Sequence, residues 1–206
     1  MLMPSRNVLK IDIPDSYYHI YSRGASRQSV FLDESDYEYF LTLLRRYLSE
    51  EDFRSKAGLS YIKLRDDIEL LAYCLMQNHF HLLVYQVDEK SMQRLMRGVI
   101  TAYSIYFNKK YGRSGALFES RYKASRIDSD EYLLHISRYI HLNPDKWLYY
   151  PYSSIKYYLT DDAEDWINPK RILEQFSSIS EYSSFLADYK DTHNELEDIK
   201  HQLAGY

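Results

Sequence analysis

The alternation of apolar and polar positions predicts short strands separated by longer helices over the first 150 residues. A strand is expected at Tyr17–Ser22, which is rich in Tyr and Ile and ends at an Arg-Gly pair. Glu69–Met76 is a nearly continuous apolar run, as expected for a strand covered on both faces. Gln77-Asn78 is a plausible tight turn to a further strand, His79–Gln86, so the two form a hairpin. A last strand is expected at Arg121–Ile127.

Helical spacing of apolar residues predicts three helices between or after these strands. They are expected at Asp33 to Leu48, at Ser91 to about Tyr111, and at Asp130 to Leu142. Asp33, Ser91 and Ser129 serve as the expected N-caps. Gly112 and Pro144 mark the ends of the second and third helices.

The order of these elements predicts an α+β protein with an antiparallel sheet and helices packed on one face. Past residue 150 the chain is acidic and helical, with stretches expected at Ser153–Leu159, at Pro169–Phe176 and from Glu181 onward. We therefore expect one main domain at residues 1–150 and an acidic helical C-terminal extension at 151–206.

Charge is distributed unevenly over the 206 residues, although the net charge is only −4. Between Lys90 and Ile127 nine bases face a single acid, Glu119, whereas the chain after Thr160 is rich in Asp and Glu. This pattern fits a local polyanion site, and it equally fits a solvated helix face with an acidic tail. The 23 tyrosines, against 8 phenylalanines, suit half-wet surfaces and base stacking.

The cysteine count and the lack of long apolar segments predict a cytoplasmic protein that does not bind a membrane. The single cysteine, Cys74, cannot form an internal disulfide. The N-terminus has no apolar segment of the signal-peptide type, and the apolar run Leu70–Met76 is too short to cross a bilayer.

Two histidines separated by one residue, His79 and His81, are the first candidates for chemistry. Alternate side chains of a strand share a face, so both imidazoles point one way and Phe80 points into the core. Such a pair can hold a metal ion, or can be one solvated and one hydrogen-bonded histidine at a strand end. His19, on the first strand, is interpreted as a core or supporting residue and not as a ligand.

The helix at 130–142 offers a partner for this pair. Tyr139 and Asn143 are four residues apart and share a face with His135. Two imidazoles and the Asn143 oxygen could coordinate a divalent ion, while the Tyr139 hydroxyl attacks phosphorus. Alternatively, Tyr139 packs in a tyrosine-rich core and Asn143 only ends the helix.

Several segments, in this order, resemble the IS200-like Y1 transposases, and most closely their REP-associated tyrosine branch, which are HUH single-strand DNA endonucleases. The segments are Tyr18-His19-Ile-Tyr-Ser-Arg23-Gly24, Tyr73-Cys74-Leu-Met-Gln-Asn-His79-Phe-His81-Leu-Leu-Val, Tyr106-Phe107-Asn108-Lys-Lys-Tyr111-Gly-Arg113, Leu117-Phe118-Glu-Ser-Arg121-Tyr122-Lys123-Ala124, Arg138-Tyr139-Ile-His-Leu-Asn143-Pro144 and Ser153-Ser154. The chain departs from the family at Gln77, where relatives usually have proline, and at Glu119-Ser120, which replaces a more usual Gln-Gly.

The resemblance implies a ferredoxin-like fold with the histidine pair on a central strand. It implies that His79, His81 and Asn143 bind a divalent metal ion, Mg²⁺ or Mn²⁺, and that Tyr139 is the nucleophile. The implied reaction is strand transfer on single-stranded DNA next to a hairpin, through a 5′-phosphotyrosine, in a monomer or a homodimer.

Basic residues of the middle segment are the expected phosphate contacts. They are Arg94, Arg97, Arg113, Arg121, Lys123 and Arg126. Two other functions remain open: a non-catalytic DNA-hairpin binder that kept the fold, and a metal phosphodiesterase that uses water in place of Tyr139.

Overall fold

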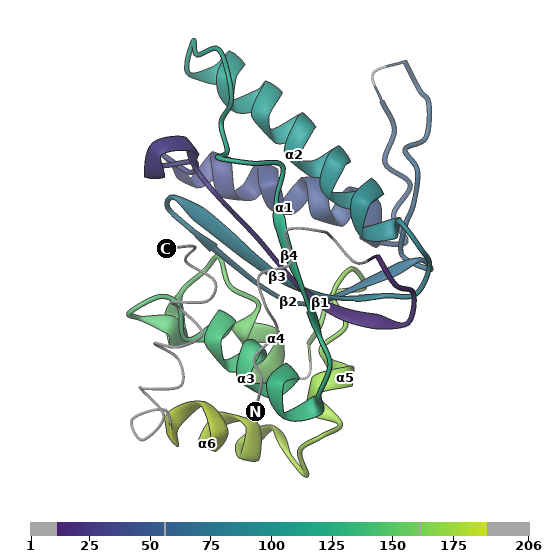
Figure 1. The fold of residues 1–206 in the computed structure, drawn as a ribbon, viewed down its shortest axis with the longest axis vertical. Coiled ribbons are helices and arrows are strands. Elements are labelled where there is room, and N and C mark those ends of the chain that lie inside the picture. The colour runs from purple at the N-terminus through teal and green to yellow at the C-terminus, as the bar shows by residue number, and fades with distance from the viewer. Residues whose placement is uncertain (1–11, 56, 161, 189–206) are drawn as a thin grey trace.

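A four-stranded antiparallel sheet forms the centre of the protein, with strand order β2-β3-β1-β4 (Figure 1). The structure is a computed structural model and describes residues 12–55, 57–160 and 162–188. The strands are β1 (Ser16–Arg23), β2 (Ile68–Met76), β3 (His79–Gln86) and β4 (Lys123–Ile127). β3 lies between β1 and β2, so the histidine pair is on a central strand, as expected.

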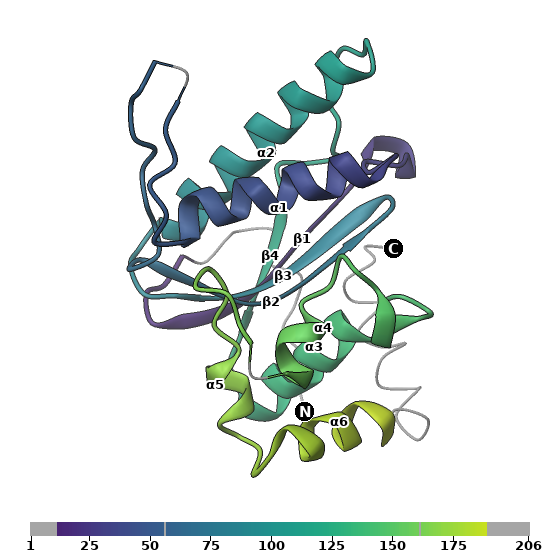
Figure 2. The same cartoon turned by 180° about the vertical axis from the view of Figure 1, so that it is seen from behind.

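The two helices that connect strands, α1 (Glu34–Leu48) and α2 (Ser91–Lys110), lie side by side on one face of the sheet (Figures 1 and 2). The order β1-α1-β2-β3-α2-β4 with this sheet order is the ferredoxin-like arrangement. Apolar side chains of both helices, such as Phe40 and Val99, form one core with inward residues of the strands, such as Phe80. The predicted α+β fold is confirmed.

The structure differs from the expected placement of helices, because the opposite face of the sheet is covered as well (Figure 2). Side chains at positions 70–75 of β2 are at most 1% exposed, so neither face of that strand can be left to water. The elements on this face begin with α3 (Asp130–His141). In chain order α3 is followed by η2 (Trp147–Tyr149), α4 (Ile155–Leu159), α5 (Lys170–Leu173) and α6 (Ile179–Ala187).

Caps explain where the helices begin. Asp33 forms a capping box with Asp36 at the start of α1, and the Ser129 side chain accepts a hydrogen bond from the Tyr132 backbone N–H. The expected cap of α2 is corrected by one residue. Ser91 is the first helical residue, and the cap position is Lys90, whose φ of 67° lies in the left-handed region.

The segment after residue 150 completes the outer edge of β2. Backbone N–H groups of Leu75 and Ser154 donate to Tyr152 and Tyr73 at 2.9 and 3.0 Å, respectively. Further along, Asn168 N–H donates to the Leu70 carbonyl at 2.8 Å. These bonds use groups that an open edge strand would leave unpaired. The domain boundary at residue 150 stays a prediction, and 189–206 of the expected extension lie outside the described residues.

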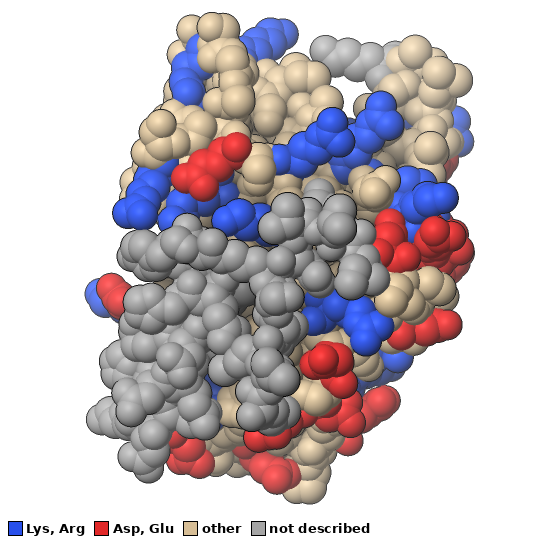
Figure 3. All heavy atoms as spheres, in the orientation of Figure 1, with Lys and Arg blue, Asp and Glu red and all other residues tan. Residues whose placement is uncertain are grey.

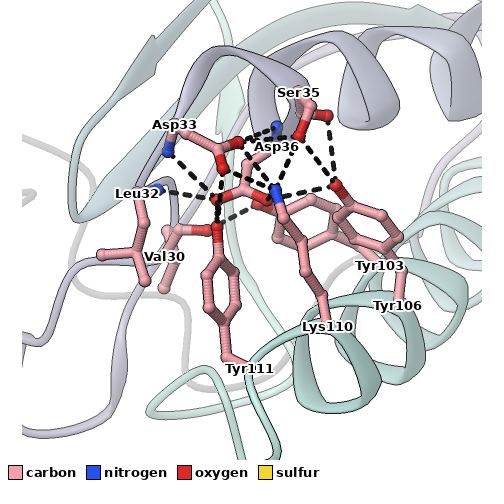
Figure 4. Close-up of polar contacts among 9 residues, drawn as sticks. All are labelled: Val30, Leu32, Asp33, Ser35, Asp36, Tyr103, Tyr106, Lys110 and Tyr111. Atoms are coloured by element: carbon pink, nitrogen blue, oxygen red, sulfur yellow. Dashed lines mark hydrogen bonds and ion pairs between the residues drawn. The ribbon is translucent and has the colours of Figure 1, made fainter.

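A polar cluster ties the beginning of α1 to the end of α2 (Figure 4). Lys110 Nζ donates to Asp33 Oδ1 at 2.7 Å and to Asp36 Oδ1 at 2.8 Å. The Asp36 side chain is fully buried, and it also accepts from the Tyr111 hydroxyl and the Leu32 backbone N–H, both at 2.8 Å. A buried carboxylate is tolerated because each oxygen has a donor.

No helix in the described part of the chain has the length and apolar character that a membrane span requires.

Candidate active site

The predicted alternation on β3 is observed. Phe80 is fully buried in the core under α1 and α2, whereas His81 is 4% exposed on the opposite face of the sheet. The rings of His79 and His81 share that face, with centroids 4.9 Å apart. The two imidazoles therefore lie side by side, on a rigid strand that pairs with a neighbour on each side.

Each imidazole has its Nδ1 occupied by a neighbour. His79 Nδ1 lies 2.7 Å from Asn78 Oδ1, and His81 Nδ1 lies 2.9 Å from His19 Nε2. In both histidines Nε2 is then the nitrogen that faces a ligand.

Both histidines of the pair are kept neutral. Burial, with the positive charge of Arg23, lowers the pKa of His79 to about 4, although a hydrogen bond with Asn143 opposes this. Burial and the neighbouring cations lower the pKa of His81 well below its usual range. Neutral imidazole is the metal-binding form, so the pair can act as ligands at any pH above about 5.

Tyr139 on α3 faces the histidines. Its ring lies edge-on to that of His81, with centroids 5.2 Å apart, and to that of His19, at 6.1 Å. The residue is 7% exposed, and burial raises the pKa of its hydroxyl to about 12. A hydrogen bond with Asn143 and the charge of Arg23 both act to lower that pKa.

Asn143 follows α3 directly and joins the two halves of the site. Its side chain hydrogen-bonds both His79 and Tyr139. The structure therefore brings together all four residues singled out for chemistry: His79, His81, Tyr139 and Asn143. Among the described residues no cluster of three His, Cys, Asp or Glu could hold a metal. The donor set that fits is two neutral imidazoles and one amide oxygen, which leaves coordination positions for substrate.

Two residues of β1 belong to the site, although neither is among the predicted site residues. His19, fully buried, is the partner of His81, so of the two roles expected from the sequence, core or supporting residue, the structure gives it the supporting one. Arg23 pairs with His79 across the β1–β3 ladder. Its charge lowers the pKa of His79, His81 and Tyr139. The available signal was the period of two on β1, which places both on the face that carries Tyr21.

Gly24, next to Arg23, fixes the turn that precedes His79. Its backbone N–H donates to the Asn78 carbonyl at 2.9 Å. A Cβ at this position would lie 2.1 Å from the Gln28 carbonyl oxygen and 2.8 Å from Val30 Cγ1. Only glycine permits this close approach of backbones.

His135, which shares a helix face with Tyr139, lies one turn before it and contacts Arg138. Its Nδ1 lies 2.9 Å from a guanidinium nitrogen of Arg138. Arg138 in turn donates to the Phe185 carbonyl of α6 at 3.2 Å and stacks on that ring. This contact anchors α3 to α6.

The expected phosphate contacts divide into three pairs, of which two lie on or near α2. Arg94 forms ion pairs with Asp67 and Asp88 at 2.9 and 3.3 Å, and Arg113 donates to Gln28 Oε1 at 2.7 Å. Arg97 and Arg121 are exposed and line a common cavity.

The two remaining contacts, Lys123 and Arg126, are on β4, where Lys123 lies over the ring of Tyr21. Basic side chains gather over α2 and the segment leading into β4 in the upper half of Figure 3.

Comparison with known proteins places this geometry in a family. A family model described as "Transposase IS200 like" matches residues 12–143. A solved structure titled as a REP-associated tyrosine transposase bound to a REP hairpin is similar in fold, with a TM-score of 0.54 and 16% identity. It covers 82% of this chain and 92% of that chain. No curated protein matches the chain. The match spans most of the chain, from β1 to Asn143, and the chain therefore belongs to the IS200-like transposase family.

Proposed function

We propose that this protein is a divalent-metal-dependent transposase that cleaves and rejoins single-stranded DNA beside a hairpin, with Tyr139 as the nucleophile. The observation that carries the proposal is the convergence of Tyr139, Asn143 and the two neutral histidines at one end of β3. Family membership supports strand transfer as the class of reaction. The REP-associated branch is supported by the fold likeness to a hairpin-bound member.

Tyr139 Oη would attack the phosphorus of a phosphodiester, forming a Tyr139–phosphate bond to the 5′ side of the downstream fragment. The bond from phosphorus to the upstream O3′ breaks. The phenol proton passes to water, and the departing O3′ takes a proton from water. A different 3′-hydroxyl then attacks the phosphotyrosine and restores the phosphodiester, so no nucleotide cofactor is consumed.

Burial raises the pKa of Tyr139, and the groups beside it limit that rise to about 12. A neutral phenol is a poor nucleophile, and the Asn143 hydrogen bond and the Arg23 charge both favour the tyrosinate. Arg23 also offers a cation for the phosphate that Tyr139 attacks.

His79, His81 and Asn143 would hold the metal ion, Mg²⁺ or Mn²⁺. When bound there, the ion would polarise a phosphate oxygen as a Lewis acid. Two imidazoles favour Mn²⁺ over Mg²⁺.

Basic residues on α2, on β4 and just before β4 would contact the phosphates of the DNA backbone. We propose Arg97, Arg121, Lys123 and Arg126 as the principal contacts, since Arg94 and Arg113 already bind neighbouring side chains. Contacts of this kind position DNA without reading its sequence. A homodimer stays a prediction of the resemblance.

The test uses single-stranded hairpin oligonucleotides from the DNA that flanks the gene, labelled at the 3′ end. With Mn²⁺ we expect a labelled protein band that survives SDS, lost in Tyr139→Phe and in His79→Ala. Tyr132→Phe, which removes another hydroxyl of α3, is the matched control and should keep the band. Cleaved product without a labelled protein band, with cleavage unchanged in Tyr139→Phe, would favour the phosphodiesterase that uses water. Binding without cleavage would favour the hairpin binder.

A further inference from the structure

A cavity of about 590 Å³ lies between α2 and the segment that leads into β4, away from Tyr139. It is lined by Gln93, Met96, Arg97, Ile100, Thr101, Arg121 and Tyr122. Its size is in the range of cavities that hold small ligands, roughly 300–1,000 Å³. Arg97 and Arg121 are proposed above as contacts to the DNA backbone, but a contact to the backbone alone does not account for a hollow at this position.

The walls of the cavity combine two cations with an apolar floor. Arg97 and Arg121 are exposed, and neither forms an ion pair with an acidic side chain within residues 12–55, 57–160 and 162–188. Arg94, one turn earlier on α2, differs because two carboxylates hold it. Met96 and Tyr122 supply buried apolar surface, 0% and 6% exposed.

Such a lining matches the chemistry of a nucleotide. Two guanidinium groups bind a phosphate strongly and in a defined orientation. The flat face of a base can lie against the Tyr122 ring and Ile100, with Met96 packed beneath them. Gln93 and Thr101 add polar groups that can hydrogen-bond a base edge or a sugar.

The register of the sheet connects the cavity with the candidate active site across the β4 edge. Tyr122 is followed by Lys123, the first residue of β4, which pairs with Tyr21 of β1. Tyr21 in turn pairs with His81 of β3. Alternate residues of a strand point to opposite faces, so Tyr122 and Lys123 lie on the two sides of the β4 edge. A DNA strand that crosses this edge would reach both the cavity and the histidines.

We infer that the cavity binds one nucleotide of the DNA substrate, with the phosphate between Arg97 and Arg121 and the base against Ile100 and Tyr122, above the buried Met96. The inference rests on the proposed function, because it takes DNA as the substrate. A free nucleotide carries the same chemistry, so the test must separate the two sources.

Methionine methyl groups report on the two sites separately in the full chain. Met96 lines the cavity, and Met76 is the register partner of His79. In NMR spectra of protein labelled with ¹³C-methyl methionine, the five methionines give at most a few methyl signals. The Met96→Leu and Met76→Leu variants identify the signals of Met96 and Met76. The probes are (dT)10, dTMP, thymidine and inorganic phosphate, each titrated without metal.

We expect (dT)10 to shift the Met96 signal, and dTMP to do so more weakly. Arg97→Ala/Arg121→Ala should weaken (dT)10 binding at Met96 by roughly a hundredfold or more, because both charge-assisted contacts to the phosphate are lost. The matched control is Arg54→Ala, which removes an exposed guanidinium paired with Asp52 on the α1–β2 loop and should change affinity less than twofold.

Three results would overturn the inference. If (dT)10 shifts the Met76 signal and leaves the Met96 signal unchanged, DNA binds at the candidate active site but not in the cavity. Binding of dTMP as tight as that of (dT)10 would make the cavity a site for free nucleotides. If neither methionine signal shifts with 1 mM (dT)10, the result contradicts DNA binding by this protein, and therefore also the inference that rests on it.

Discussion

Nε2 of His19 lies 2.9 Å from Nδ1 of His81, across the β1–β3 pair. One proton is shared in this contact, and its position decides whether His81 can bind a metal. If His81 donates from Nδ1, its Nε2 carries a lone pair toward the site, and His19 keeps its own proton on Nδ1. The opposite arrangement would leave a proton on His81 Nε2. His19 therefore sets the tautomer of a proposed ligand without being a ligand itself.

Replacing His19 by Phe should weaken Mn²⁺ binding about 10- to 100-fold, the range seen when the partner of a metal-binding histidine is lost. Phenylalanine keeps a ring in the buried site but removes the acceptor for His81 Nδ1–H. Isothermal titration with Mn²⁺ at pH 7.5 measures the change.

His19→Gln is the conservative control for this prediction. Its amide oxygen can accept from His81, so part of the affinity should return. Equal Mn²⁺ affinity in the wild-type protein and both variants would contradict a role for His19 in the site.

The sequence predicted the elements well because they follow local rules. The bounds of β3 are those expected, and α3 begins at the residue after Ser129, as its cap predicts. His79 and His81 share a face because a strand has a period of two. The side-by-side packing of Tyr139 and the histidines was expected only through family resemblance, since spacing alone left packing and chemistry equally open.

The remaining features depend on contacts between distant segments. His19 and His81 are 62 positions apart, and no local pattern encodes the register that joins them. The helices on both faces follow from the burial of β2 on both sides, which a nearly continuous apolar run indicates but does not assign to particular helices. Arg94 was expected to meet DNA, yet its two carboxylate partners lie 27 and 6 positions away.

Buried histidines should make the protein sensitive to mild acid. His19, His81 and His141 are 0%, 4% and 0% exposed, and burial lowers the pKa of each, to about 3 for His19 and His141. In the unfolded chain these groups titrate near pH 6.5. Below that pH the unfolded state binds more protons than the folded state, so stability is full above pH 6.5 and falls as the pH decreases.

We expect the free energy of unfolding to drop by roughly 3–5 kcal/mol between pH 7.5 and 5.5 without metal, from these three groups and His79, whose pKa is also lowered, at up to about 1.4 kcal/mol each. Urea unfolding at several pH values measures it. In His141→Gln, which removes the contacts to Tyr182 and Ser154, the slope against pH should fall by about one proton. A stability that stays flat down to pH 5.5 would show that these histidines titrate in the folded protein as they do in the unfolded chain, and that their pKa values are not lowered.

Lys110→Met tests the cluster that joins α1 to α2 (Figure 4). Asp36 is fully buried, so loss of its cation leaves a carboxylate supported only by neutral donors. We expect a loss of about 3 kcal/mol in the free energy of unfolding, measured with urea.

The Lys110–Asp36 pair can be separated from the rest of the cluster by a second change. Asp36→Asn/Lys110→Met removes both charges and should recover part of that loss, which gives the coupling energy of the pair. If Lys110→Met alone costs less than about 0.5 kcal/mol, water compensates Asp36 and the pair contributes little.

Arg23 is expected to act on the chemistry more than on metal binding. Its charge lowers the pKa of both Tyr139 and His79. In Arg23→Ala the Tyr139 pKa should rise above about 12, and a pKa higher by one would make the tyrosinate about tenfold rarer at a fixed pH. The His79 pKa should also rise, but from about 4, so His79 stays neutral at pH 7.5 and Mn²⁺ binding is kept.

We therefore expect the rate of SDS-stable adduct formation to fall about 10- to 100-fold in Arg23→Ala at saturating Mn²⁺ and pH 7.5. In the wild-type protein the rate should rise about tenfold for each increase of one in pH from pH 6.5 to 9, because the attacking form is the minor one. Arg23→Lys keeps the charge and should recover much of the rate. If Arg23→Ala lowers the Mn²⁺ affinity as well as the rate, Arg23 instead stabilises the end of the β1–β3 pair, where it is the register partner of His79.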